Sequence, residues 1–120
     1  MVGKRFPLVM VPRFSTYIGS GEFASLGIDV SKFDEARVHV WRGEMSGTGI
    51  LALTVKFEES TDRVVWFDCD GGAPLAIPED DETSFDLTLA RQYLRIVPTV
   101  AGTDPAVTLY AVGHLNQRTK

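Results

Sequence analysis

The chain has 120 residues, of which 16 are acidic and 12 are lysine or arginine, and its formal net charge is −4. This length suits one domain with one hydrophobic core, and the single cysteine, Cys69, excludes an intramolecular disulfide and a zinc site built from cysteines. The apolar run at residues 8–11 is too short for a signal peptide or a membrane span. We therefore expect a soluble chain that is made and kept without export.

The charges are segregated along the chain. Residues 1–21 contain Lys4, Arg5 and Arg13 and no acidic residue, whereas residues 58–86 contain ten acidic residues against Arg63 alone. Phosphate binding needs a basic stripe, so this distribution argues against a nucleic-acid partner. The basic and acidic segments either attract each other between neighbouring copies or are solvated surfaces that confer solubility.

The first segment, residues 1–22, is predicted to be an extended N-terminal arm. Pro7 and Pro12 bracket an apolar run, and proline within a strand is confined to sheet edges. Such a segment is either an edge strand of its own domain or an arm that adds to the sheet of a neighbour. After it, at most one short helical turn is expected, at residues 30–35, where Ser31 could cap it.

Residues 23–120 are predicted to form a single antiparallel β-sandwich or jelly roll, so the fold class is all-β. Apolar and polar residues alternate with the period of two that places one set in a core. Turns are expected at residues 46–49, 61–63 and 102–105, where glycine, aspartate and proline gather. The alternating runs are residues 36–41, 51–58, 65–69, 85–89, 94–100 and 107–111.

No pattern of catalytic residues is apparent, and we expect a protein that is not an enzyme. His39 and His114 are the two histidines, no Gly-x-Ser-x-Gly motif is present, and Cys69 falls on an apolar strand face. Pairs of carboxylates are plentiful, but a glycosidase holds two of them across a cleft that so small a domain would hardly form.

The acidic loops raise the question of a metal ion. Asp68, Asp70 and Gly71 resemble the start of a calcium loop, but the 12-residue spacing with a terminal glutamate is missing. The run Glu79–Glu82 could add ligands from a second loop, so calcium and a solvated acidic turn both stay open. We expect no cofactor.

Four aromatic side chains fall on the polar phase of their strands: Trp41, Trp66, Tyr93 and Tyr110. Such rings either line a face that binds a sugar or a partner, or are covered by another part of the fold. We expect Trp66 to be covered and leave Trp41 open.

The motifs around these rings resemble a known scaffold. Ser60-x-Asp62-x-x-x-Trp66, followed by Ala90-Arg91-x-Tyr93-Leu94-Arg95-Ile96-x-Pro98, is similar to the discoidin-like (coagulation factor type C, galactose-binding-like) sandwich. The resemblance covers about the last 70 residues, and Arg63 stands where that family often has glycine. The recognition loops of that family have no visible counterpart here. The alternative function that it implies is a carbohydrate-binding module that uses Trp41 and Trp66.

The layout of the whole chain resembles small virion proteins of tailed phages. The matching features are the extended N-terminal piece, the segment from Glu58 to Trp66, the strand around Arg91–Arg95 and the segment from Thr99 to Thr108. This resemblance implies a non-enzymatic capsid decoration (cement) or head–tail protein, located in the virion and made in the host cytoplasm.

The partners implied by the phage resemblance are the major capsid protein or other virion subunits. A homo-oligomer is expected, with a trimer plausible because cement proteins commonly occupy threefold positions, and neither nucleic acid nor membrane is expected as a partner. The candidate partner-binding residues are Leu8, Val9, Met10, Val11, Arg13, Phe14, Tyr17 and Trp41.

Overall fold

The computed structural model describes residues 5–117, which form an all-β fold of nine strands and no helix. This confirms the predicted fold class. Within these residues no helix has the length and apolar character that a membrane crossing requires. The strands are β1 (Arg5–Ile18), β2 (Gly21–Glu22), β3 (Ile28–Asp29), β4 (Phe33–Arg42), β5 (Ser46–Ser60), β6 (Phe67–Asp68), β7 (Leu75–Ala76), β8 (Glu82–Thr88) and β9 (Tyr93–Gln117).

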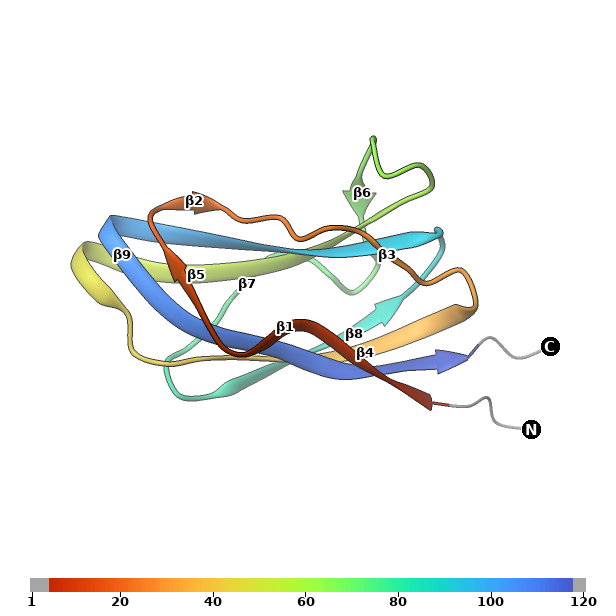
Figure 1. The fold of residues 1–120 in the computed structure, drawn as a ribbon, viewed down its shortest axis with the longest axis horizontal. Coiled ribbons are helices and arrows are strands. Elements are labelled where there is room, and N and C mark those ends of the chain that lie inside the picture. The colour runs from red at the N-terminus through yellow and green to blue at the C-terminus, as the bar shows by residue number, and fades with distance from the viewer. Residues whose placement is uncertain (1–4, 118–120) are drawn as a thin grey trace.

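The last strand, β9, belongs to both layers of the sandwich (Figure 1). Its first part pairs with β5 on one side and with the short strands β2 and β3 on the other. Its second part pairs with β1 and β4, and β8 follows β4. One layer is therefore β2/β3–β9–β5 with β6 and β7, and the second layer is β1–β9–β4–β8.

The bend in β9 lies at residues 102–105, where a turn between two strands was expected. Gly102 has φ +133° and Asp104 has φ +49°, and there the chain turns from the first layer into the second and runs back along the molecule (Figure 1). On β5, a Cβ at Gly47 would lie 2.9 Å from the carbonyl oxygens of Thr103 and Asp104. Glycine at position 47 thus lets the start of β5 follow the bend closely.

The core fills the space between the two layers with the inward-facing residues of β4, β5, β8 and β9. Phe57 of β5 and Phe85 of β8 meet edge to face across the layers, with ring centroids 4.8 Å apart. Both are fully enclosed, and burying one such side chain stabilises the fold by about 1.5–3 kcal/mol.

Several local predictions were wrong. The expected helical turn at residues 30–35 is a hydrogen-bonded turn, with Phe33 N–H donating to Val30 O, and β4 already begins at Phe33. The expected hairpin turn at residues 46–49 is the irregular start of β5. The run at residues 65–69 contributes only the two residues of β6.

The N-terminal segment lies in the domain's own sheet. β1 pairs antiparallel with β9, which is the edge-strand alternative of the prediction, while residues 1–4 lie outside the described range. Leu8 and Val11 point into the core. This corrects their assignment as partner-binding residues, because a side chain enclosed in its own core has no surface to offer a neighbour.

We expect Phe57→Ala to lower the free energy of unfolding by about 3–5 kcal/mol, because it leaves a cavity between the layers. Chemical denaturation measures this change. Phe57→Leu is the control, since it retains most of the buried apolar volume and should cost less. A loss below about 1 kcal/mol for Phe57→Ala would contradict a core centred on this contact.

Candidate interaction face

The second layer, β1–β9–β4–β8, exposes one side to solvent, which we call the outer face. Strand alternation directs every second residue of these strands away from the core, and the register aligns those residues in rows across the sheet. Each row is given in the strand order β1, β9, β4 and β8. The first row is Arg5, Asn116, Glu35 and Thr88, and the second row is Pro7, His114, Arg37 and Asp86. The third row is Val9, Val112, His39 and Ser84, and the fourth row is Tyr110, Trp41 and Glu82, without a paired β1 residue.

The fourth row is an aromatic stack that a charged side chain flanks at each end. The rings of Trp41 and Tyr110 are stacked, with centroids 5.4 Å apart and planes 17° from parallel. The guanidinium of Arg13 lies over Tyr110, 4.4 Å from the ring centroid. β1 and β4 flank β9 on opposite sides, so Arg13 and Trp41 cover the two faces of the Tyr110 ring.

The hydroxyl of Tyr110 links this stack to β8. It donates a hydrogen bond to Glu82 Oε2 at 2.7 Å, and this bond raises the pKa of Tyr110 above its ordinary value. A charge-assisted bond of this kind fixes the ring in place. The four side chains of Arg13, Tyr110, Trp41 and Glu82 therefore form one ordered unit across the sheet.

Phe14 stands beside this unit in an unusual conformation. Its φ is +67°, and its side chain is 91 % exposed. Positive φ is strained for a bulky residue. It arises where the pairing of β1 with β9 is irregular, between Val11 and Ser15. Strain that presents an apolar ring to solvent is the kind of feature found at binding surfaces. A hollow of about 300 Å³ is lined by Arg13, Phe14, Trp41, Thr108 and Tyr110.

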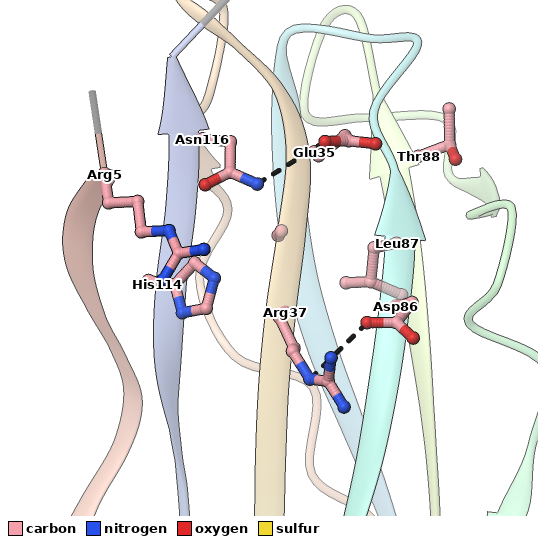
Figure 2. Close-up of a pocket in the computed structure, with 9 residues that line it drawn as sticks. Arg5, Glu35, Arg37, Asp86, Leu87, Thr88, His114 and Asn116 are labelled. Carbon is pink, nitrogen blue, oxygen red and sulfur yellow. Dashed lines mark hydrogen bonds and ion pairs between the residues drawn. The ribbon is translucent and has the colours of Figure 1, made fainter. Parts of the chain in front are cut away.

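A second, polar hollow of about 240 Å³ lies at the other end of the outer face (Figure 2). There Arg5 lies beside His114, and Arg37 reaches toward Asp86 at 3.6 Å. The side chains of that ion pair are 50 % and 76 % exposed, so the pair contributes at most about 1 kcal/mol. These groups keep their charges available to a partner.

The histidines show no catalytic arrangement among residues 5–117. His39 Nδ1 lies 2.8 Å from Ser84 Oγ, but no carboxylate of these residues hydrogen-bonds His39, and Ser84 sits on a regular strand. Burial, followed by the nearby carboxylate of Glu59, raises the pKa of the Cys69 thiol to about 12. Such a thiol is a poor nucleophile. In the same range no three His, Cys, Asp or Glu side chains converge on a point where a metal ion could bind.

The motif from Ser60 to Trp66 builds a corner of the sandwich. Asp62 Oδ1 accepts hydrogen bonds from the N–H groups of Val64 and Val65, and Ser60 Oγ accepts one from Arg63 N–H at 2.9 Å. Those two backbone donors, together with the Ser60 hydroxyl, lower the pKa of Asp62. This geometry is a loop clamp, and it supports the interpretation that the motif specifies the scaffold.

Arginines of both motifs hold the same corner through ring contacts. Each guanidinium lies 4.2 Å from a ring centroid: Arg63 over Tyr93, Arg91 over Phe67 and Arg95 over Trp66. Trp66 also packs so closely on the loop after β2 that a Cβ at Gly27 would lie 2.7 Å from its ring. Trp66 is thus half-buried and covered by Arg95 and the loop at Gly27, as predicted.

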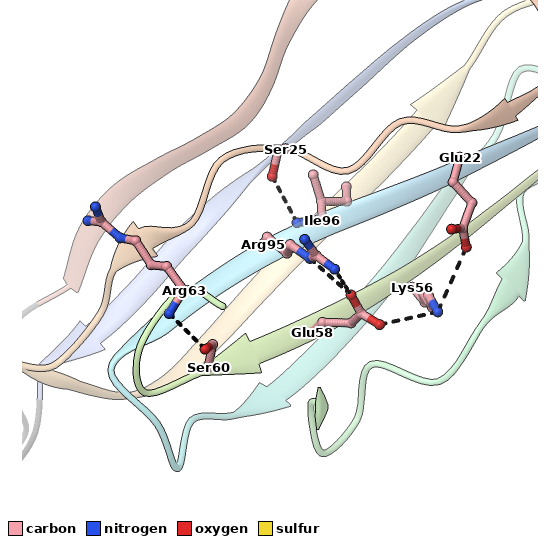
Figure 3. Close-up of polar contacts among 8 residues, drawn as sticks. All are labelled: Glu22, Ser25, Lys56, Glu58, Ser60, Arg63, Arg95 and Ile96. Carbon is pink, nitrogen blue, oxygen red and sulfur yellow. Dashed lines mark hydrogen bonds and ion pairs between the residues drawn. The ribbon is translucent and has the colours of Figure 1, made fainter. Parts of the chain in front are cut away.

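An ion network continues from this corner along the first layer (Figure 3). Arg95 donates two hydrogen bonds to Glu58 Oε1, at 2.9 and 2.6 Å, and Lys56 lies 3.2 Å from Glu58 Oε2. Burial raises the pKa of Glu58, but the hydrogen bonds and charges of Arg95 and Lys56 outweigh it, so the net pKa lies below its ordinary value. Next to it, the buried carboxylate of Glu59 accepts bonds from Arg91 and from Ala90 N–H.

The predicted partner-binding residues divide into three groups. Arg13, Phe14 and Trp41 come together around one hollow, and Val9 lies on the same outer face. Met10 and Tyr17 are half-buried against the core, and Leu8 and Val11 are inside it. Sequence reasoning missed the role of Tyr110 and Glu82, although Tyr110 had been recognised as out of phase with the core.

We expect Glu58→Gln to lower the free energy of unfolding at pH 7 by about 1.5–3 kcal/mol, because it removes a charged hydrogen-bond acceptor from Arg95 and Lys56. The folded-state pKa of Glu58 is depressed, so its contribution is complete above the unfolded pKa, about 4.3, and is lost as the pH falls through the folded value.

The difference between Glu58→Gln and wild type should therefore be smaller at pH 3 than at pH 7. Urea denaturation at both pH values measures it. Glu44→Gln, on an exposed connection, is the control and should change little at either pH. A difference that stays constant down to pH 3 would contradict the role of the charged network.

Comparison with known proteins shows similarity in fold without similarity in sequence. No protein-family model and no curated protein matches the chain. The SPBc2 prophage-derived protein YomS is similar with a TM-score of 0.55 at 11 % identity, covering 95 % of this chain and 96 % of its own. This similarity supports the fold.

Two further solved structures are less similar. A chain of Bacillus endospore appendages, described as disulfide-linked pili, gives a TM-score of 0.48 at 10 % identity and covers 98 % of this chain and 88 % of its own. A chain of infectious bursal disease virus strain Gx gives 0.46 at 10 % identity, with 97 % of this chain and 37 % of its own. The discoidin-like resemblance is not shown by any of these comparisons.

Proposed function

We propose that the chain is a non-enzymatic structural protein of a tailed-phage particle, and specifically a capsid decoration (cement) protein. The observation that carries the proposal is the outer face, where a strained, exposed Phe14 stands beside an ordered Arg13–Tyr110–Trp41–Glu82 unit. An apolar ring held in solvent beside fixed charges is suited to a protein partner. The similarity in fold to a prophage-derived protein supports the phage context.

The geometry of the aromatic stack favours a protein surface over a sugar. Sugar rings bind by lying flat on a free aromatic face. Both faces of Tyr110 are covered, by Arg13 and by Trp41, and the ring of Trp66 is covered by Arg95 and the loop at Gly27. What the outer face offers is ring edges, the Phe14 side chain and charged groups, which suit the major capsid protein or another virion subunit.

The test is the composition of phage particles that carry this gene. We expect the chain in purified particles by mass spectrometry, and we expect Phe14→Ala or Trp41→Ala to lower its incorporation at least tenfold while the isolated proteins stay folded. Leu26→Ala is the matched control, because Leu26 is 90 % exposed and lies beside the first layer, away from the outer face. Absence of the wild-type chain from the particles overturns the proposal, as does specific glycan binding on an array that Trp41→Ala abolishes.

A further inference from the structure

The two edges of the outer face carry opposite charges. Among the described residues, β1 contains Arg5 and Arg13 and no acidic residue, and β8 contains Glu82 and Asp86 and no basic residue. The loop that leads into β8 adds the exposed carboxylates of Asp80 and Asp81. The middle strands hold the aromatic stack, the two histidines and one residue of each charge, Glu35 and Arg37, of which Arg37 lies 3.6 Å from Asp86. The outer face is therefore basic along one side, acidic along the opposite side and partly apolar between them.

A face with this pattern is complementary to itself. Consider a twofold axis that runs along the strands, between β9 and β4 and in the plane of contact. Rotation about this axis places β1 of one copy over β8 of the other and keeps the position along the strands unchanged. Arg13 then faces Glu82 of the second copy, and Arg5 comes within reach of Asp86 of that copy. The stacked rings of Trp41 and Tyr110 meet their equivalents at the centre.

The size of the outer face suits such a contact. Four strands spaced by about 4.8 Å, over the ten residues of β4 at about 3.4 Å each, give on the order of 650 Å² per copy. Specific protein interfaces bury about 800 Å² per partner, with transient ones below that. The exposed apolar side chains of Val9 and Phe14 on β1 would lose contact with water in the assembly.

Joining the sheets edge to edge is less favourable. Proline has no N–H to donate, and β1 carries Pro7 and Pro12. The pairing of β1 with β9 is interrupted after Val9 and again after Val11, and Phe14 has a positive φ. An edge with missing donors and two irregularities cannot continue the hydrogen-bond ladder into another copy. The β1 edge is therefore unsuited to strand addition, and the charge pattern favours a face-to-face contact.

We infer that the outer face binds a second copy of this chain, in a twofold, face-to-face dimer held by β1–β8 charge pairs around the central aromatic stack. This inference rests on the proposed assembly function and names the partner of the same face. It also predicts that the dimer weakens as the salt concentration rises, because the pairs at its rim are screened.

Two complementary variants test this inference. The acidic variant carries Arg5→Glu and Arg13→Glu and keeps Glu82 and Asp86. Its β1 and β8 edges are then both acidic. The basic variant carries Glu82→Lys and Asp86→Lys and keeps Arg5 and Arg13. Its β1 and β8 edges are then both basic. Each should repel itself, and we expect the dissociation constant of the dimer to rise at least tenfold for each alone, measured by analytical ultracentrifugation. Mixed together, they should form a 1:1 heterodimer, because both of its β1–β8 contacts are then attractive.

Lys32→Glu and Glu44→Lys reverse charges in connections outside the four rows and should leave the wild-type dimer unchanged. Far-UV circular dichroism checks that every variant is folded. If Glu82→Lys disrupts the stack, a second complementary pair is available: one chain that carries only Asp86→Lys, mixed with a chain that carries only Arg5→Glu. A wild-type chain that stays monomeric, or a mixture that stays monomeric, overturns the inference. A mixture that forms trimers or longer assemblies also overturns the inference. A twofold contact uses the same face on both copies and closes at the dimer, whereas only head-to-tail contacts add a third chain.

The two proposals fail separately. A monomeric wild-type chain that is still incorporated into particles, and lost with Phe14→Ala, removes the dimer and leaves the virion function. A dimer whose chain is absent from particles removes the virion function and leaves the dimer.

Discussion

The structure depends on the pairing of one strand, β9, with neighbours in both layers. Its first part holds β5, β2 and β3, and its second part holds β1 and β4. A strand in the middle of a sheet has its backbone groups satisfied on both sides, and β9 does this twice, before and after its bend. The kink at Gly102 and Asp104 is therefore the constraint that sets the two layers face to face and encloses the core.

The same constraint creates the outer face. Because β9 passes through the centre of the second layer, Tyr110 is flanked by β1 on one side and by β4 on the other. Arg13 and Trp41 thereby reach the two faces of one ring. At the far end of the first layer, the clamp around Asp62 and the arginine–aromatic contacts hold the corner. Scaffold and interaction surface are thus separate parts of the fold, and the residues that resembled a sugar-binding family belong to the scaffold.

Much of the fold could be predicted because alternation is a local property. The core positions of β4, β5, β8 and β9 follow directly from their period of two, and Phe57, Phe85 and Leu109 are enclosed as that pattern requires. The errors occurred where a local signal has two meanings. Residues 102–105 do redirect the chain, but the turn lies within one continuous strand, because β5 stays paired with β9 on both sides of it. Ser31 was read as a helix cap, whereas its N–H bonds to Asp29 in a tight turn.

The candidate site was predictable only in fragments. Trp41 and Tyr110 could each be recognised as out of phase with the core, and Arg13 and Phe14 as part of a basic, extended segment. The strain at Phe14 has no sequence signal, because it follows from how β1 is forced to pair with β9.

The sequence by itself determined the all-β class, the inward and outward faces of the main strands and the separation of basic from acidic segments. Only the tertiary structure decided that β1 is an edge strand, that Arg13, Tyr110, Trp41 and Glu82 share a row, and that the opposite charges lie on opposite edges of one face. The physical reason is that alternation arises from neighbouring residues on one strand, whereas register and strand order arise from contacts between segments far apart in the chain.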